Sequence, residues 1–365
     1  MVSFKILAGG YSTFIATYLF NTTPQASTLE VISRSPTGIN PSWLSFHPTN
    51  KSLLYTVNEY DRGAVQSFLV KEDGSLSSAI DVVSSSGESP AHVIALKSTG
   101  QVVAMNYNSG NGRIINATTT GRFVAEVAQT VTFQEPAGPI SHPHQAYEYK
   151  DKIWVPDLGL DTIWRLVPDQ ASGQLVKVAG SIPQPKGSGP RHISIYKQRL
   201  FVLHELSSTL TVQKIPDLAF DKVSIIANVS IAPEDGPADA IYAAAEILIP
   251  PLTRKFPKSY IYVSNRNKGE TPDPRGDSIA IFEHVYPGTR KEGLKLVKQV
   301  FTGLSQIRGM EFGPAKNGGD EFLVAAASNS TGGVIVLKRV KGGRDLEIVA
   351  KDTTIGTRTS LVWVD

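Results

Sequence analysis

The chain has 365 residues, of which 41% are hydrophobic and 19% charged, a composition typical of a folded globular protein with a sizeable core. Its 36 basic and 33 acidic residues leave a formal charge of +3, and no run of Lys or Arg is long enough to indicate nucleic-acid binding. The absence of cysteine excludes disulfides and a cysteine nucleophile, and no apolar window is long enough for a transmembrane helix.

The first twenty residues predict two short strands and not a secretion signal, because Gly9, Gly10, Ser12 and Thr13 interrupt the apolar segments. We therefore expect a cytoplasmic protein. Secretion stays open as the alternative, since five N-x-S/T sequons would matter in a secreted chain. They begin at Asn21, Asn50, Asn116, Asn228 and Asn329.

Short apolar runs rich in Val, Ile, Leu, Tyr and Phe, separated by Gly, Asn, Asp and Pro, predict β-strands along the rest of the chain. A repeat appears when four of these runs are aligned, because each begins at or beside a proline and is followed by two further strands. They are NPSWLSFHP, SPAHVIAL, HPHQAYEY and GPRHISIY. Two more divergent copies, AAAEILIP and IRGMEFG, follow. Successive copies start about fifty residues apart, which is the period of a four-stranded propeller blade.

Six such units begin at Pro41, Pro90, Pro143, Pro190, Ala244 and Ile307. The chain then ends on a single strand, TSLVWVD, while its N-terminus supplies three strands that lack a first one. Joining the two ends completes a seventh blade and removes the exposed sheet edges. The sequence thus predicts an all-β, seven-bladed β-propeller of four-stranded antiparallel blades, as one domain of residues 1–365.

The repeat also predicts which polar residues meet. In an antiparallel pair the start of the first strand and the end of the second lie on the same side. The position after the proline holds Ser42, Ala91, His144, Arg191, Ala245 and Arg308 in successive blades. The ends of the second strands add Glu59, Glu205 and Arg266. We expect the charged members of both sets to converge on one mouth of the central channel.

The segments SHPHQAYEY, VPDLGLDTIWRL, GPRHISIY, LHELSSTLTV, YIYVSNRN and QIRGM resemble those of the lactonase-type seven-bladed propellers. That family includes 6-phosphogluconolactonases and the fungal carboxy-cis,cis-muconate cyclases. The resemblance covers nearly the whole chain and implies lactone chemistry on a small anionic substrate. It implies His144, Glu205, Arg191 and Arg266 as catalytic residues. We add four expected substrate-binding residues near the same mouth: Arg308, His142, Glu59 and Asn265.

The side chains suit that chemistry. Histidine titrates near neutrality, so His144 is the expected proton carrier, while Glu205 either orients it, takes the proton itself or steadies an arginine. Arg191 and Arg266 are permanently charged donors for a carboxylate, a phosphate or a developing oxyanion. The same groups serve lactone hydrolysis or muconate-type cycloisomerisation, and the residues do not choose between them. A propeller that binds without catalysis is the alternative of another class.

A metal site is the next possibility, because Glu59, Asn106 and Asp157 fall near the ends of strands. Their register is scattered and their neighbours are cationic, whereas hard cations need several oxygen ligands together. We therefore expect no metal and no cofactor. The expected partner is a small anionic substrate, with no nucleic acid and no membrane, and the sequence does not indicate an oligomeric state.

Other residues have structural interpretations. His92 and His192 follow the channel-rim position, so strand alternation predicts that they point away from the channel and bond to a neighbouring blade. Tyr55, Trp154 and Tyr262 recur in the second strands and are expected in the core. The stretches 231–258 and 267–277 are rich in Pro and Gly and are interpreted as loops that either cover the mouth or lie on the surface.

Overall fold

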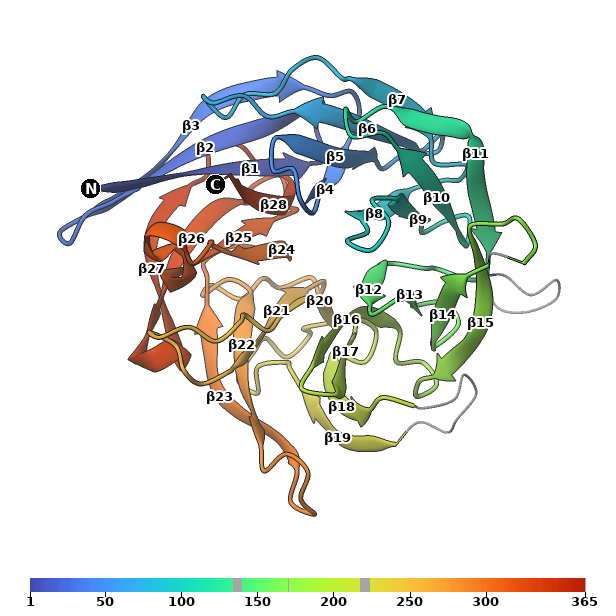
Figure 1. Ribbon diagram of the computed structural model, residues 1–365. Coiled ribbons are helices and arrows are strands. Elements are labelled where there is room, and N and C mark those ends of the chain that lie inside the picture. Colours follow the sequence, from blue (N-terminus) through green and yellow to red (C-terminus); the bar gives the residue numbers. More distant parts are fainter. Residues whose placement is uncertain (134–139, 170, 217–223, 365) are drawn as a thin grey trace.

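Seven four-stranded antiparallel sheets form a closed ring (Figure 1). The computed structural model describes residues 1–133, 140–169, 171–216 and 224–364. In each sheet one strand borders the centre of the ring and three follow outward, so the predicted seven-bladed propeller is confirmed. Within the described ranges no helix is both long and apolar enough to span a membrane.

The strands follow the repeat closely, from the inner to the outer edge of each blade. The first three blades are β4 (Pro41–Phe46), β5 (Leu53–Asn58), β6 (Ala64–Leu69) and β7 (Asp81–Ser84); β8 (Pro90–Ala95), β9 (Val102–Asn106), β10 (Asn111–Ala117) and β11 (Phe123–Thr132); and β12 (Tyr147–Tyr149), β13 (Lys152–Asp157), β14 (Thr162–Pro168) and β15 (Val176–Pro183). The fourth and fifth are β16 (Pro190–Tyr196), β17 (Arg199–His204), β18 (Thr209–Lys214) and β19 (Ile225–Ser230); and β20 (Tyr242–Leu248), β21 (Ile261–Asn267), β22 (Ser278–Val285) and β23 (Gly293–Phe301).

The sixth blade contains the two short 3₁₀ helices of the described chain. It comprises β24 (Ile307–Phe312), η1 (Lys316–Glu321), β25 (Phe322–Ala327), β26 (Gly333–Val340), η2 (Lys341–Gly343) and β27 (Asp345–Asp352). The seventh comprises β28 (Arg358–Val364), β1 (Val2–Gly10), β2 (Phe14–Thr22) and β3 (Ser27–Pro36). β28 and β1 pair with Leu7 opposite Val362, so the predicted closure by the two chain ends is confirmed. Asp365, which ends the predicted last strand, lies outside the described residues.

Two predicted segments differ from the structure. The first strand of the third blade was expected from Pro143, but β12 begins only at Tyr147, and Pro143 makes an isolated bridge with Asp157. Before β12 the chain is held by single contacts, such as the N–H of His144 donating to the carbonyl of Pro156 at 3.0 Å. The stretch 231–258 is not one loop, because β20 lies inside it.

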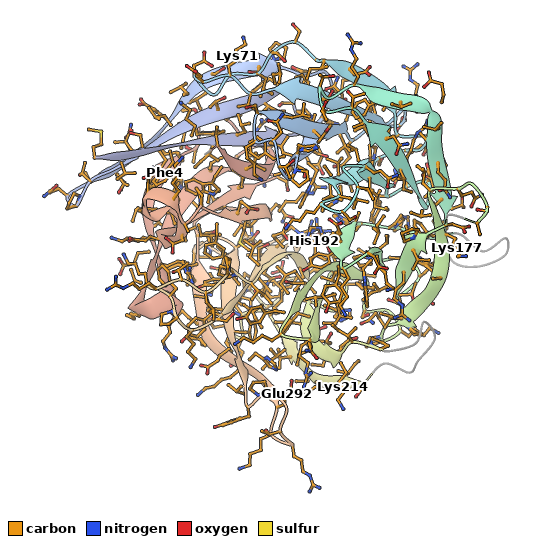
Figure 2. The ribbon with its side chains drawn as sticks, viewed as in Figure 1. Phe4, Lys71, Lys177, His192, Lys214 and Glu292 are labelled. Carbon is orange, nitrogen blue, oxygen red and sulfur yellow. The ribbon has the colours of Figure 1, made fainter. Side chains whose placement is uncertain are left out.

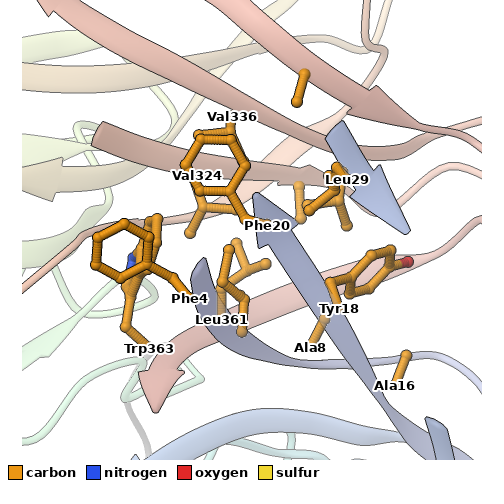
Figure 3. Packing of buried hydrophobic residues seen from close by; sticks show 14 of the residues in the cluster. Phe4, Ala8, Ala16, Tyr18, Phe20, Leu29, Val324, Val336, Leu361 and Trp363 are labelled. Carbon is orange, nitrogen blue, oxygen red and sulfur yellow. The ribbon is translucent and has the colours of Figure 1, made fainter. Parts of the chain in front are cut away.

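Apolar side chains between neighbouring blades form the core. The cluster that joins the sixth and seventh blades contains Phe4, Phe20 and Trp363 from the two chain ends, packed on Phe322 and Val324 (Figure 3). Tyr55, Trp154 and Tyr262 are at most 2% exposed, which confirms them as core residues. Because each blade packs on its neighbours, the inner strands are fixed relative to one another around the axis.

Replacing Phe20 by alanine should weaken the ring at its closure. Phe20 is fully buried, and its ring centroid lies 4.9 Å from that of Phe322 and 6.3 Å from that of Trp363. Loss of a buried phenylalanine costs about 3–5 kcal/mol of unfolding free energy. The midpoint of urea unfolding measures the effect, with the 46%-exposed Ile348 changed to alanine as the control. Equal midpoints for Phe20→Ala and Ile348→Ala would show that this closure is not where the ring derives its stability.

Candidate functional site

An extra residue near the start of the inner strands brings the charged side chains to the axis. In β16, Pro190 pairs with His204 and His192 with Leu203, so Arg191 between them is a β-bulge. β8 has the same shift after Pro90 and β24 after Ile307. A bulge bends the strand and breaks its regular alternation of side chains. Arg191 and the next residue can therefore both be directed towards the centre of the ring.

The turn between blades three and four fixes this bulge. Gly189 has a φ of 62° and donates its N–H to Asp161 at 2.8 Å, and its carbonyl accepts the N–H of Glu205 at 2.7 Å. A Cβ on Gly189 would lie 2.5 Å from the side chain of Leu206. The glycine thus lets the start of β16 and the end of β17 approach, which places Arg191 and Glu205 side by side.

Glu205 is the centre of a buried ion-pair cluster. Its Oε2 lies 2.8 Å from Nε of Arg191 and 2.9 Å from Nη2 of Arg266, and its Oε1 lies 3.2 Å from Nζ of Lys268. Arg191 also donates to the carbonyl of Ala245, and Arg266 donates to the carbonyl of Ala244 at 2.8 Å. The exposed fractions of Arg191, Glu205 and Arg266 are 1%, 9% and 7%. The predicted convergence of these three residues is therefore present in the structure.

Protonation in this cluster follows from burial and charge. Burial opposes ionisation of Glu205, but Arg266, Arg191 and Lys268 outweigh it and lower the pKa of Glu205 to about 2. Burial and the nearby Arg266 lower the pKa of Arg191 to about 10. At neutral pH the cluster therefore holds three cations and one carboxylate. Its net positive charge suits an anionic ligand.

Arg308 and Glu59 form a second pair at the same mouth. Nη2 of Arg308 lies 3.1 Å from Oε2 of Glu59, and Nη1 donates to the carbonyl of Ser42 at 3.2 Å. The hydroxyl of Tyr11 donates to Oε1 of Glu59 at 3.1 Å. Arg308 is 4% exposed. These contacts link the sixth, first and seventh blades. Arg308 and Glu59, both predicted at this mouth, therefore lie together and form an ion pair with each other.

His144 is buried between the cations and a second histidine. It is 5% exposed, and its Nδ1 lies 3.2 Å from Nε2 of His192. Burial and then Arg191 hold the pKa of His144 well below its usual range, so its imidazole is neutral at physiological pH. The structure gives no hydrogen bond between His144 and Glu205 among the described residues, and Glu205 is engaged by arginine and lysine.

The remaining predicted binding residues lie close by. His142 stacks on Tyr107 with ring centroids 4.4 Å apart, and its Nδ1 lies 2.8 Å from the carbonyl of that tyrosine. Asn265 is 1% exposed and accepts the backbone N–H of Arg266 at 3.1 Å, while its Nδ2 has no hydrogen-bond partner in the described structure. Both therefore border the Arg266 and His144 region without joining the ion-pair cluster.

The residues considered for a metal have other contacts. Asp157 accepts hydrogen bonds from Ser141 at 2.5 Å and from the indole of Trp164 at 3.0 Å. Asn106 donates to the carbonyl of Ser85 at 2.8 Å. Both fasten the end of a second strand to a neighbouring loop or strand. Over the ranges that the structure describes, no three His, Cys, Asp or Glu side chains are arranged as metal ligands.

The prediction for His92 and His192 is wrong in one respect. His192 does bond to neighbouring blades, but it lies near the centre of the ring (Figure 2). Its ring centroid is 5.3 Å from that of Trp43 in the first blade and 5.9 Å from that of His92. The bulge at Arg191 is the reason, because it shifts the alternation on which the prediction depended. Glu246, at the same repeat position in β20, also points inward and lies 2.8 Å from His192.

Sequence reasoning did not select Lys268. A signal was present, since Lys268 follows Arg266 by two positions, and alternate residues at the end of a strand share a face. The lysine comes from the loop 268–277, which packs on the loop 232–241 through Arg275 and Asp235, whose ionic atoms are 2.7 Å apart. The contact of Lys268 with Glu205 places the start of the loop 268–277 beside the charged cluster.

A cavity of about 300 Å³ lies on the axis, further along the inner strands. Gln145, Ser194, Glu246, Glu311 and Ser360 are among its lining residues, whereas His144 and Arg191 are not. It is thus distinct from the charged cluster at the starts of the inner strands. Glu246 faces this cavity while touching His192, so it connects the two regions.

Fold and site together define a seven-bladed propeller with a buried cationic cluster at one mouth. The chain belongs to the family described as lactonase, 7-bladed beta-propeller, which matches residues 5–363. It is 24% identical over 314 residues to a 6-phosphogluconolactonase of Bacillus subtilis, covering 83% of this chain and 81% of that protein. It is 25% identical over 333 residues to an uncharacterised protein of Staphylococcus saprophyticus, covering 88% of each.

Solved structures agree on the fold. The periplasmic gluconolactonase of Pseudomonas aeruginosa superposes with a TM-score of 0.81 at 19% identity, over 100% of this chain and 99% of that one. A structure described as a putative 6-phosphogluconolactonase of Bacteroides fragilis gives a TM-score of 0.78 at 21% identity, over 100% and 98% of the two chains. At these identities the similarity concerns the arrangement of blades.

Proposed function

We propose that the protein hydrolyses the lactone ring of a small anionic substrate at the mouth formed by His144, Arg191, Glu205 and Arg266. Family membership and the named 6-phosphogluconolactonase relative support lactone chemistry. In this proposal His144 takes a proton from water, and the hydroxide attacks the lactone carbonyl. Arg191 and Arg266 hold the substrate anion and the developing oxyanion, and Glu205 keeps the arginines in place.

The burial of His144 beside Arg191 is the observation that favours hydrolysis over cyclisation. Burial and Arg191 keep the pKa of this imidazole low, so it is a base at neutral pH and only a small fraction carries the proton that an acid would deliver. Hydrolysis begins with proton removal from water. Muconate-type cycloisomerisation would require the site to deliver a proton to carbon, and Glu205, held ionised with a pKa of about 2, is a poor donor.

The contacts of Glu205 support its role as an anchor. Its two oxygens meet Arg191, Arg266 and Lys268, and no described contact links it to His144. A carboxylate bound in this way restricts the guanidinium groups to one geometry before substrate arrives, which lowers the cost of ordering them. The excess positive charge remains available for the substrate.

An assay of two substrates side by side tests the proposal. We expect 6-phosphogluconolactone to be hydrolysed faster than its spontaneous opening, with no turnover of carboxy-cis,cis-muconate and an unchanged rate after treatment with a chelator. Uncharged gluconolactone is the control for the role of the anion, and the cationic cluster predicts a higher KM for it. Turnover of the muconate alone would support the cyclase, and saturable binding without turnover of any lactone would support a binding scaffold.

A further inference from the structure

Three buried side chains from successive blades form a hydrogen-bonded chain that leads away from the charged mouth. Nδ1 of His144 lies 3.2 Å from Nε2 of His192, and Nδ1 of His192 lies 2.8 Å from Oε1 of Glu246. Their exposed fractions are 5%, 0% and 5%. His192 lies near the centre of the ring (Figure 2), so the chain connects three adjacent blades beside the axis.

The direction of these hydrogen bonds follows from the backbone next to Glu246. Oε1 of Glu246 accepts the N–H of Ile247 at 3.0 Å, and when the carboxyl is ionised it can only accept from His192 as well. His192 then carries its proton on Nδ1 and offers the lone pair of Nε2 to His144. His144 consequently donates from Nδ1, and its Nε2 holds a lone pair. The described residues supply no hydrogen-bond partner for that Nε2, which leaves it available to a water at the mouth.

Electrostatics disfavour leaving an extra proton on either imidazole. Burial lowers the pKa of both His144 and His192, and Arg191 and Arg308 lower them further. An imidazole of His144 or His192 that kept an extra proton would become a cation beside two arginines. If each imidazole accepts a proton on Nε2 and gives up the proton on Nδ1, both rings stay neutral. The added proton then reaches Glu246, where it neutralises a carboxylate.

Glu246 is suited to that exchange. Burial raises its pKa to about 8, although Arg191 and Arg308 act in the opposite direction. The charged and titratable groups that face it are Arg191 and His192 from β16 and Arg308 and Glu311 from β24. Glu246 also lines the axial cavity, which is distinct from the charged mouth. Both of its protonation states are therefore accessible near physiological pH.

We propose that Glu246, His192 and His144 form a reversible proton relay for lactone opening, an inference that rests on the hydrolysis proposed above. Water gives a proton to Nε2 of His144, the Nδ1 proton of His144 moves to Nε2 of His192, and the Nδ1 proton of His192 moves to Glu246. The hydroxide adds to the carbonyl carbon and the ring C–O bond breaks. The relay then runs backwards and protonates the alkoxide, which restores all three groups, while the new carboxylic acid ionises in solution. His192 and Glu246 are positioning residues in this scheme.

Changing Glu246 to glutamine tests the relay, with Glu311→Gln as the matched control. Glu311 lines the same cavity, and burial raises its pKa to about 8 as well, but it lies outside the hydrogen-bonded chain. The wild-type kcat should rise with pH as Glu246 loses its proton near pH 8. We expect Glu246→Gln to lower kcat at least about tenfold, to leave KM unchanged and to abolish that rise. Glu311→Gln should keep the wild-type kcat and its increase with pH.

Two results would overturn the relay. One is a wild-type dependence of kcat on pH in Glu246→Gln, and the other is loss of the increase in kcat in Glu311→Gln.

Nitrogen-15 NMR of the histidines provides a test on the wild-type chain that needs neither turnover nor a stable variant. Above about pH 8, where Glu246 is ionised, both His144 and His192 should be neutral with the proton on Nδ1, and the His192 signals should shift as Glu246 titrates. A proton on Nε2 of either ring above that pH would contradict the proposed direction. If this pattern is found but no lactone is hydrolysed, the proposed function fails; if lactone is hydrolysed and the pattern is missing, only the relay fails.

Discussion

His144→Gln should lower kcat for lactone hydrolysis by about 10²–10⁴-fold, the range contributed by a positioned general base. Glutamine can still form a hydrogen bond towards His192, so the contact at 3.2 Å need not be lost, but an amide does not take a proton from water. The arginines and Glu205 remain in place, and KM should therefore change little. Initial rates over a range of substrate concentrations, followed by proton release in weak buffer, separate the two constants.

The matched control is His47→Gln. His47 lies beyond the end of β4, where its Nδ1 accepts the backbone N–H of Asn50 at 3.1 Å, and it contacts none of the groups at the mouth. Its variant should hydrolyse lactone at the wild-type rate. If His144→Gln retained kcat within a few fold of His47→Gln, the base would have to be another group, and the assignment of the mouth as the reaction site would lose its main support.

The ring and part of the site could be predicted because both follow from the repeat. The repeat places Arg191 and Arg308 at equivalent positions of the fourth and sixth blades, and the hairpin between β16 and β17 brings Arg191 to Glu205. The closure of β28 on β1 follows from the single strand left over at the C-terminus. These inferences depend only on strand order and antiparallel pairing, which a sequence pattern reveals.

The contacts of His192 and Glu246 could not be predicted in the same way. Alternation assigns a face to each residue only while the register is regular, and the bulge that turns His192 inward leaves no mark of its own in the sequence. The pairing of Arg308 with Glu59 spans 249 positions and depends on how the sixth and first blades pack. Side-chain pairing across the axis, including the contacts of His192 with His144 and Glu246, is thus a property of the assembled ring.

Glu205→Gln should lower the free energy of unfolding by about 3–5 kcal/mol, the usual cost of removing one partner from buried ion pairs. Arg191, Arg266 and Lys268 would then face one another without the carboxylate that now separates them. Activity should fall with stability, since the arginines lose their common anchor. The midpoint of urea unfolding measures the first effect, and Glu234→Gln is the control because Glu234 is exposed on the loop 232–241.

The pH dependence of the difference in unfolding free energy between wild type and Glu205→Gln shows whether the charge of Glu205 causes that difference. Folding lowers the pKa of Glu205 from an ordinary value of 4.5 to about 2, so the unfolded chain binds the proton more readily and acid favours unfolding. The stabilising contribution is complete above about pH 4.5 and is lost as the pH falls towards 2. The gap in unfolding free energy between wild type and Glu205→Gln should therefore be widest above pH 4.5 and narrow below it. A gap that stayed constant from pH 6 to pH 3 would indicate that the glutamine disturbs packing and that the charge of Glu205 is not what holds the arginines.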